Sequence, residues 1–163
     1  MKYLVLFIFL AFAGLPQAQP ISSATTDELI EKLRPATSTT RSIGRNLAPQ
    51  TKSIDLVIQF EFNSTRLKPE SKPLIDNLVS ALKSEQLKNI SFLVEGHTDA
   101  QGSYDYNQSL SLKRANSVVQ YMTQQGIIQE RLKAEGKGFS DLLLPEKPLA
   151  MENRRVRITA VSQ

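Results

Sequence analysis

The sequence predicts an α+β fold, a two-layer sandwich with a mixed β-sheet in the order β-α-β-α-β-β and the helices on one face. Strands are indicated where apolar and polar residues alternate over several positions. Helices are indicated where apolar residues recur every third or fourth position. Two strand–helix–strand connections predict parallel neighbours in the sheet, and the polar positions of the strands predict that its second face is solvated.

The first strand and the first long helix are expected within residues 53–84. In "SIDLVIQFEF", residues 53–62, apolar residues occupy every second position from Ile54 to Phe62, which predicts a strand with one wet side. The spacing becomes helical in "LKPESKPLIDNLVSALKS", residues 67–84, where Pro69 and Pro73 are tolerable only in a first turn. The apolar stripe of this helix consists of Leu74, Ile75, Leu78, Val79 and Leu82.

A second helix is predicted from about Tyr106 to Gln125, with Gly126 as its C-terminal stop. At 100° per residue its core arc consists of Leu112, Ala115, Val118, Val119 and Met122, and the flank beside the arc holds Asn107, Leu110 and Arg114. The remaining strands are predicted over residues 89–96, 131–138 and 154–161, with a proline-containing loop over 139–153.

The N-terminal part predicts an export signal and a tether. Residues 1–18 combine Lys2 with an apolar run over 3–12 that is too short to span a bilayer, which is typical of a cleaved signal. Residues 19–52 read as a tether with one helix of about two turns, capped by Thr26 or Asp27 and stopped by Pro35. Its apolar side holds Leu29, Ile30 and Leu33. The domain itself is expected over residues 53–163.

Composition narrows the classes of function. The 163 residues include no cysteine, so disulfides and a thioether-linked lipid are not expected, and no cofactor or metal is expected with a single histidine. Removing the signal lowers the formal net charge from +4 to +3, because Lys2 is its only charged residue. The lysines and arginines are scattered, so no nucleic-acid partner is expected. With no further transmembrane segment, the mature chain is expected in a Gram-negative periplasm, with association to the outer membrane left open.

One stretch carries the candidate site. "GHTDAQGSYDYNQSLSLKRANSV", residues 96–118, leads from a strand end through a loop with Asp99 into the second helix, whose flank carries Arg114. This arrangement brings a carboxylate, a guanidinium and free backbone N–H groups toward one surface pocket. His97 has no metal partner and no nucleophile turn beside Ser103, so a hydrogen-bonded structural role is expected. Tyr104 and Tyr106 could line the pocket or pack the loop.

These motifs resemble the core signature of the OmpA-like peptidoglycan-binding family, which also includes peptidoglycan-associated lipoproteins and flagellar-stator domains. The resemblance covers residues 53–161 and keeps several motifs in order. The matching residues are Gly96, His97, Thr98, Asp99, Gly102, Tyr106, Asn107, Leu110, Ser111, Arg114, Ala115 and Val118, with "FEFNSTRLKPE" before them and "GKG" and "NRRV" after them.

The resemblance implies a non-enzymatic protein that binds the peptide stem of peptidoglycan at diaminopimelate. Asp99 would take the ligand's ammonium and Arg114 its carboxylate, since an arginine can hold a carboxylate through two hydrogen bonds. Asn63 and Asn107 would add polar contacts, and Thr98 and Leu110 complete the ligand-binding set. Two charged contacts predict a single-site affinity on the order of micromolar.

Alternative interpretations remain at this point. Asp99 could simply cap a turn, and Arg114 could be a solvated helix residue. Arg154 and Arg155 are expected to tie the last strand to the loops, with one of them bordering the pocket. The domain could also be a protein-interaction module that docks on an envelope assembly through the tether and the "FSDLLLP" loop, residues 139–145.

Overall fold

The computed structural model describes residues 19–35, 51–61 and 64–161. The expected signal over 1–18, the tether over 36–50 and the candidate ligand residue Asn63 lie outside these described residues. The α+β prediction is confirmed, because four strands form one mixed sheet with helices on one face. The elements are α1 (Thr26–Leu33), β1 (Ser53–Leu56), α2 (Lys72–Lys83), β2 (Ser91–His97), α3 (Tyr104–Gln124), β3 (Leu132–Gly138) and β4 (Val156–Val161).

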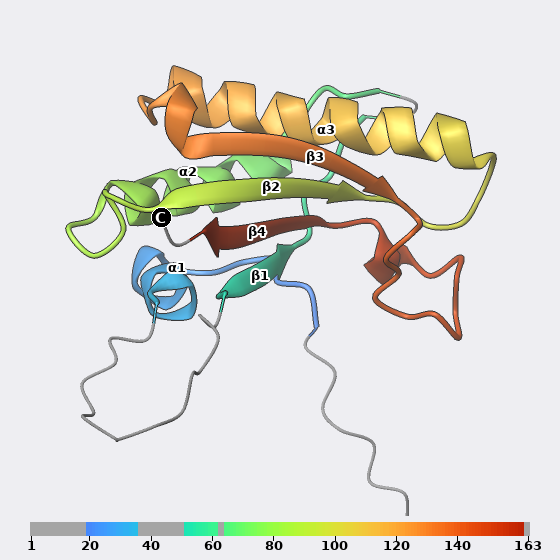
Figure 1. Cartoon of the computed structure of the whole chain (residues 1–163), viewed down its shortest axis with the longest axis horizontal. Coiled ribbons are helices and arrows are strands. Elements are labelled where there is room, and N and C mark those ends of the chain that lie inside the picture. The colour runs from blue at the N-terminus through green and yellow to red at the C-terminus, as the bar shows by residue number, and fades with distance from the viewer. Residues whose placement is uncertain (1–18, 36–50, 62–63, 162–163) are drawn as a thin grey trace, which may run out of the picture.

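The sheet has the strand order β1-β4-β2-β3. β2 and β3 are the parallel neighbours that a strand–helix–strand connection predicts, with Val94 opposite Ala134. The first connection differs from the prediction, because β4 lies between β1 and β2 and pairs antiparallel with both. The last strand of the chain therefore occupies a central position in the sheet. This position brings the residues just before β4 close to the end of β2 (Figure 1).

The first strand is shorter than its alternating pattern predicts. β1 ends at Leu56, although Ile58 is still buried and Phe60 packs against the core. Beyond Leu56 the backbone bonds elsewhere: Gln59 N–H donates to Ser71 Oγ, and Phe60 forms a bridge with Leu67. The alternation thus correctly predicted that Ile58 and Phe60 face the core. After Leu56, however, the backbone of this segment no longer pairs with strands of the sheet.

α3 packs very closely on β2 and β3, where glycines face it. A Cβ atom on Gly96 would lie 2.1 Å from the carbonyl oxygen of Ser111, and one on Gly136 would lie 2.6 Å from the nitrogen of Leu112. Ser111 Oγ is fully buried and accepts a hydrogen bond from the N–H of Gly138. The predicted core arc is therefore wrong at Leu112, which is 41% exposed, and Ser111 takes a buried place beside it.

The short helix α1 belongs to the folded body. Thr25, rather than Thr26 or Asp27, caps it and forms a capping box with Glu28. Leu29 and Leu33 are fully buried in the same core as α2 and the sheet. Ile21, which precedes α1, forms a parallel bridge with Leu56 at the outer edge of β1. Figure 1 shows α1 beside β1, at the far side of the sheet from β3.

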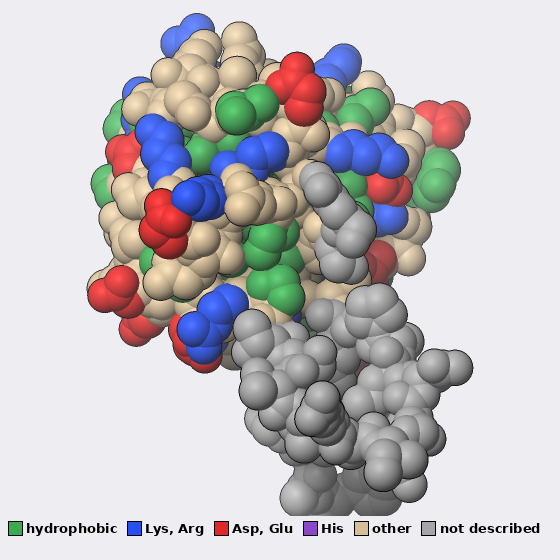
Figure 2. Space-filling model, turned by 60° about the vertical axis from the view of Figure 1, so that its left-hand side comes forward, with side chains coloured by type: hydrophobic (Ala, Val, Ile, Leu, Met, Phe, Trp, Pro, Cys, Tyr) green, Lys and Arg blue, Asp and Glu red, His purple; other side chains and the backbone are tan. Residues whose placement is uncertain are grey.

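The charged surface is mixed. On the face in Figure 2, lysine and arginine side chains are separated by acidic, polar and apolar ones. Of the helices in the described part of the chain, none combines the length and the apolar character needed to cross a bilayer.

Candidate functional site

Asp99 lies just beyond the end of β2, in the loop that leads into α3. Its Oδ1 accepts a hydrogen bond from the N–H of Gln101 at 3.1 Å, so it does cap a turn. Its Oδ2 also accepts one from Nη1 of Arg154 at 2.9 Å. The side chain of Asp99 is 10% exposed and that of Arg154 is 43% exposed. The carboxylate is therefore a nearly buried anion whose cationic partner comes from the surface.

Arg114 projects from α3 into the same region. Its guanidinium lies over the ring of Phe60, 5.0 Å from the centroid. Its Nε is buried and has no hydrogen-bond partner among the described residues. Burial lowers the pKa of Arg114 and so does the charge of Arg154, whereas Tyr106 and Asp99 act in the opposite direction. The charges of Asp99 and Arg154 therefore both act on the guanidinium of Arg114.

A small cavity of about 20 Å³ separates these arginines from the sheet. It has room for about one water molecule and is too small for an amino-acid side chain. Its lining consists of Ile58, Phe60, Gly96, His97, Arg114, Arg154, Arg155 and Val156. A ligand that reached Asp99 or Arg114 would therefore approach from the surface, on the side of the exposed Arg154 side chain.

The other predicted site residues have different surroundings. Asn107 is buried, and its Nδ2 donates to the carbonyl oxygens of Gln101 and Ser103, so it holds the loop after β2 against α3. Thr98 is buried, with its N–H donating to Gly138 and its hydroxyl without a partner among the described residues. Leu110 is partly exposed and lines a second hollow.

That second hollow lies between α3 and the segment after β1. It measures about 380 Å³ and is open to the surface. Its lining consists of Ser64, Thr65, Tyr106, Ser109, Leu110 and Lys113.

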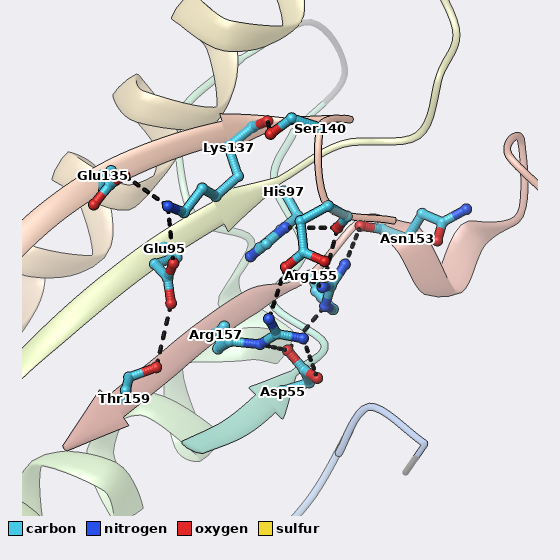
Figure 3. A network of polar contacts seen from close by, with 11 residues as sticks. Asp55, Glu95, His97, Glu135, Lys137, Ser140, Asn153, Arg155, Arg157 and Thr159 are labelled. Carbon is cyan, nitrogen blue, oxygen red and sulfur yellow. Dashed lines mark hydrogen bonds and ion pairs between the residues drawn. The ribbon is translucent and has the colours of Figure 1, made fainter. Parts of the chain in front are cut away.

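A largely buried ion network joins β1 to β4 and the residue just before it (Figure 3). Arg155 is fully buried, and its Nε donates to Asp55 Oδ1 at 2.8 Å. Arg157 donates to the same oxygen from its Nε at 2.9 Å. Burial would raise the pKa of Asp55, but the hydrogen bond from Arg157 and the charges of both arginines hold it below its usual value. The network is a structural clamp between β1 and β4.

His97 has the structural position that the sequence predicts. It is buried at the end of β2, and its Nδ1 lies 3.2 Å from the carbonyl oxygen of Asp141. A carbonyl can only accept, so Nδ1 carries the proton. Burial and the charges of Arg155 and Arg157 lower the pKa of His97 to about 4, so the ring is neutral at pH 7.

The arrangement is suited to binding a charged ligand. One carboxylate and two guanidiniums can hold a ligand that carries both an ammonium and a carboxylate. In the part of the chain that the structure describes, no cluster of His, Asp and Glu side chains could hold a metal ion. The predicted ligand-binding set does not include Arg154. The sequence nevertheless predicts that either Arg154 or Arg155, just before β4, borders the pocket.

The sequence and the fold are similar to those of known envelope proteins. A sequence profile described as the OmpA family matches residues 59–156. Outer membrane protein A of Buchnera aphidicola subsp. Schizaphis graminum is 36% identical over 116 residues, which cover 64% of this chain and 33% of that protein. The chain thus spans about a third of the length of this curated relative.

Two solved structures share the fold. The peptidoglycan-associated lipoprotein from Burkholderia pseudomallei aligns with a TM-score of 0.56 and 25% identity, over 64% of this chain and 88% of that one. The cell wall anchor of the T6SS from Pseudomonas aeruginosa aligns with a TM-score of 0.55 and 25% identity, over 71% of this chain and 85% of that one.

Proposed function

The chain belongs to the OmpA family, and from this premise we propose that it binds cell-wall peptidoglycan without cutting it. The ligand group is the diaminopimelate of the peptide stem, and binding holds the protein at the wall in the periplasm. Two relatives of the same fold support this proposal through their names, one as peptidoglycan-associated and the other as a cell wall anchor.

The observation that carries the proposal is the ion pair of the nearly buried Asp99 with Arg154, close enough to Arg114 for both charges to act on it. Asp99 is the anion for the ligand's ammonium, and Arg114 is the cation for its carboxylate. Arg154 already occupies Asp99 Oδ2, so the ammonium either shares this oxygen or displaces the Arg154 side chain. Displacement is feasible because that side chain is 43% exposed.

A charged hydrogen bond contributes about 1.5–3 kcal/mol when it is desolvated. Two such contacts with a few neutral ones give an affinity on the order of micromolar for one stem. Thr98, whose buried hydroxyl lacks a partner among the described residues, is a further candidate contact. Asn107 contributes by fixing the loop, because both hydrogens of its amide nitrogen already bond to that loop.

The test is sedimentation of the mature protein with isolated sacculi. Asp99→Asn keeps an oxygen for the Gln101 N–H, removes the charge and replaces the oxygen that accepts from Arg154 by an NH2 group. Arg114→Gln removes the guanidinium. Glu130→Gln makes the same chemical change as Asp99→Asn at an exposed position outside the site. We expect the wild type and Glu130→Gln to pellet and the two site variants to stay in solution while circular dichroism shows them folded.

Equal pelleting of all four proteins would contradict the proposal. The protein-interaction alternative would then gain support, since it requires a partner that binds independently of Asp99. The loop after β3 would be the first surface to examine, because Leu149 and Met151 are among its exposed apolar side chains.

A further inference from the structure

The second hollow lies beside the proposed diaminopimelate site. Leu110, which lines the hollow, is four positions before Arg114 and three before Lys113 on α3, so its side chain neighbours both of them on the helix surface. Tyr106 also lines the hollow and acts on the pKa of Arg114. A ligand held at Arg114 therefore has the hollow as its next surface along α3.

The hollow has a positive and hydrogen-bonding lining. Among the described residues of the lining, Lys113 is the one that carries a charge, and it is exposed and forms no ion pair with any described residue. Hydroxyl groups come from both walls, with Ser64 and Thr65 on the segment after β1 and Ser109 on the helix. No acidic side chain is among the described residues that line it. A cation with hydroxyl donors around it is suited to a carboxylate.

We propose that this hollow binds a second carboxylate of the same peptide stem, on the residue next to the diaminopimelate. This inference rests on the proposed function. In a peptidoglycan stem, glutamate joined through its γ-carboxyl group precedes the diamino acid, so its α-carboxylate is free. Neighbouring side chains on a helix surface are about 5–6 Å apart at their Cβ atoms. An extended α-linked residue advances about 3.3–3.6 Å, and the γ linkage adds two methylene groups to this path, so one residue of the stem can span the step. Amidation of that carboxylate would remove the charge that Lys113 recognises.

The test is calorimetric titration with two synthetic probes, L-Ala-γ-D-Glu-meso-diaminopimelate and the same tripeptide with its glutamate α-carboxylate amidated. The variant is Lys113→Gln, and the matched control is Lys133→Gln, on an exposed position of β3. For the wild type and the control we expect the acid to bind about twofold to fivefold more tightly than the amide, as for one solvent-exposed charge contact. Lys113→Gln should bind both probes equally.

Three results would overturn the inference. If Lys113→Gln keeps the preference for the acid, or if the wild type shows none while binding both probes, Lys113 does not read this carboxylate and the proposed function stands. If the wild type binds neither probe, the diaminopimelate site itself fails and the inference fails with it.

Discussion

Asp99 and Arg154 are 55 positions apart in the sequence, yet their Oδ2 and Nη1 atoms lie 2.9 Å apart. The contact exists because β4 inserts beside β2, so that the residues before β4 meet the loop that follows β2. In the protein without a ligand, Arg154 is thus bound to Asp99, the carboxylate that is proposed to bind the ligand's ammonium. Under the proposed function, the ligand's ammonium would share Asp99 with Arg154 or displace it.

Two adjacent arginines should contribute very differently to stability. Arg154→Gln should lower the free energy of unfolding by less than about 1 kcal/mol, since its partly exposed ion pair is screened by water. Arg155→Gln should cost more, about 1.5–3 kcal/mol, because it removes the charged hydrogen bond of a fully buried guanidinium and leaves Arg157 as the remaining partner of Asp55. Urea unfolding of both variants measures this difference. Equal losses would mean that the Arg155 network is not the clamp described above.

His97 should make stability depend on pH between 6.5 and about 4. Its pKa is about 4 in the folded chain and 6.5 as the ordinary value, so in this window only the unfolded chain binds the proton. The contribution is complete above pH 6.5 and decreases as the pH falls toward 4, by at most about 3 kcal/mol. The free energy of unfolding of His97→Asn should therefore vary less with pH over this window. Parallel curves for both proteins would refute the assignment.

Leu29→Ala should destabilise the domain by about 2–5 kcal/mol, as for a leucine truncated in a packed core. The reason is that Leu29 is fully buried in the same core as α2 and the sheet. Glu31→Ala, an exposed change on the same helix, should cost far less. Thermal unfolding measures both. A small effect of Leu29→Ala would instead support the boundary predicted at residue 53, with α1 as part of a loosely attached tether.

Gly136→Ala should cost about 3 kcal/mol or more, because the added methyl would meet backbone atoms of α3 that cannot move independently. Gly126→Ala is the comparison, since there the nearest atom is the end of the Lys83 side chain and only the positive φ is strained. Urea unfolding should rank Gly136→Ala as the more damaging change. The reverse order would show that α3 can move away from β3.

Local patterns were sufficient for most of the fold. The alternation and helical spacing predicted every strand and both long helices, and the loop and helix motifs predicted where Asp99 and Arg114 lie. The strand order could not be predicted, because it depends on which distant segment pairs with β1. Helical spacing predicts Leu112 in the core, because it carries no information on how closely α3 packs against the glycines of β2 and β3. The part played by Arg154 likewise depends on a contact that only the folded chain makes.

The bridge between Ile21 and Leu56 has a consequence for solubility. A strand at the border of a sheet exposes N–H and C=O groups that can template pairing with another chain. Here Ile21 N–H donates to Asp55, and Val57 N–H donates to Ile21, so the chain itself occupies this border of β1. A protein trimmed past Ile21 would expose these groups and should be more prone to self-association and fibre formation. We therefore expect a segment outside the pocket to limit self-association by covering this border of β1.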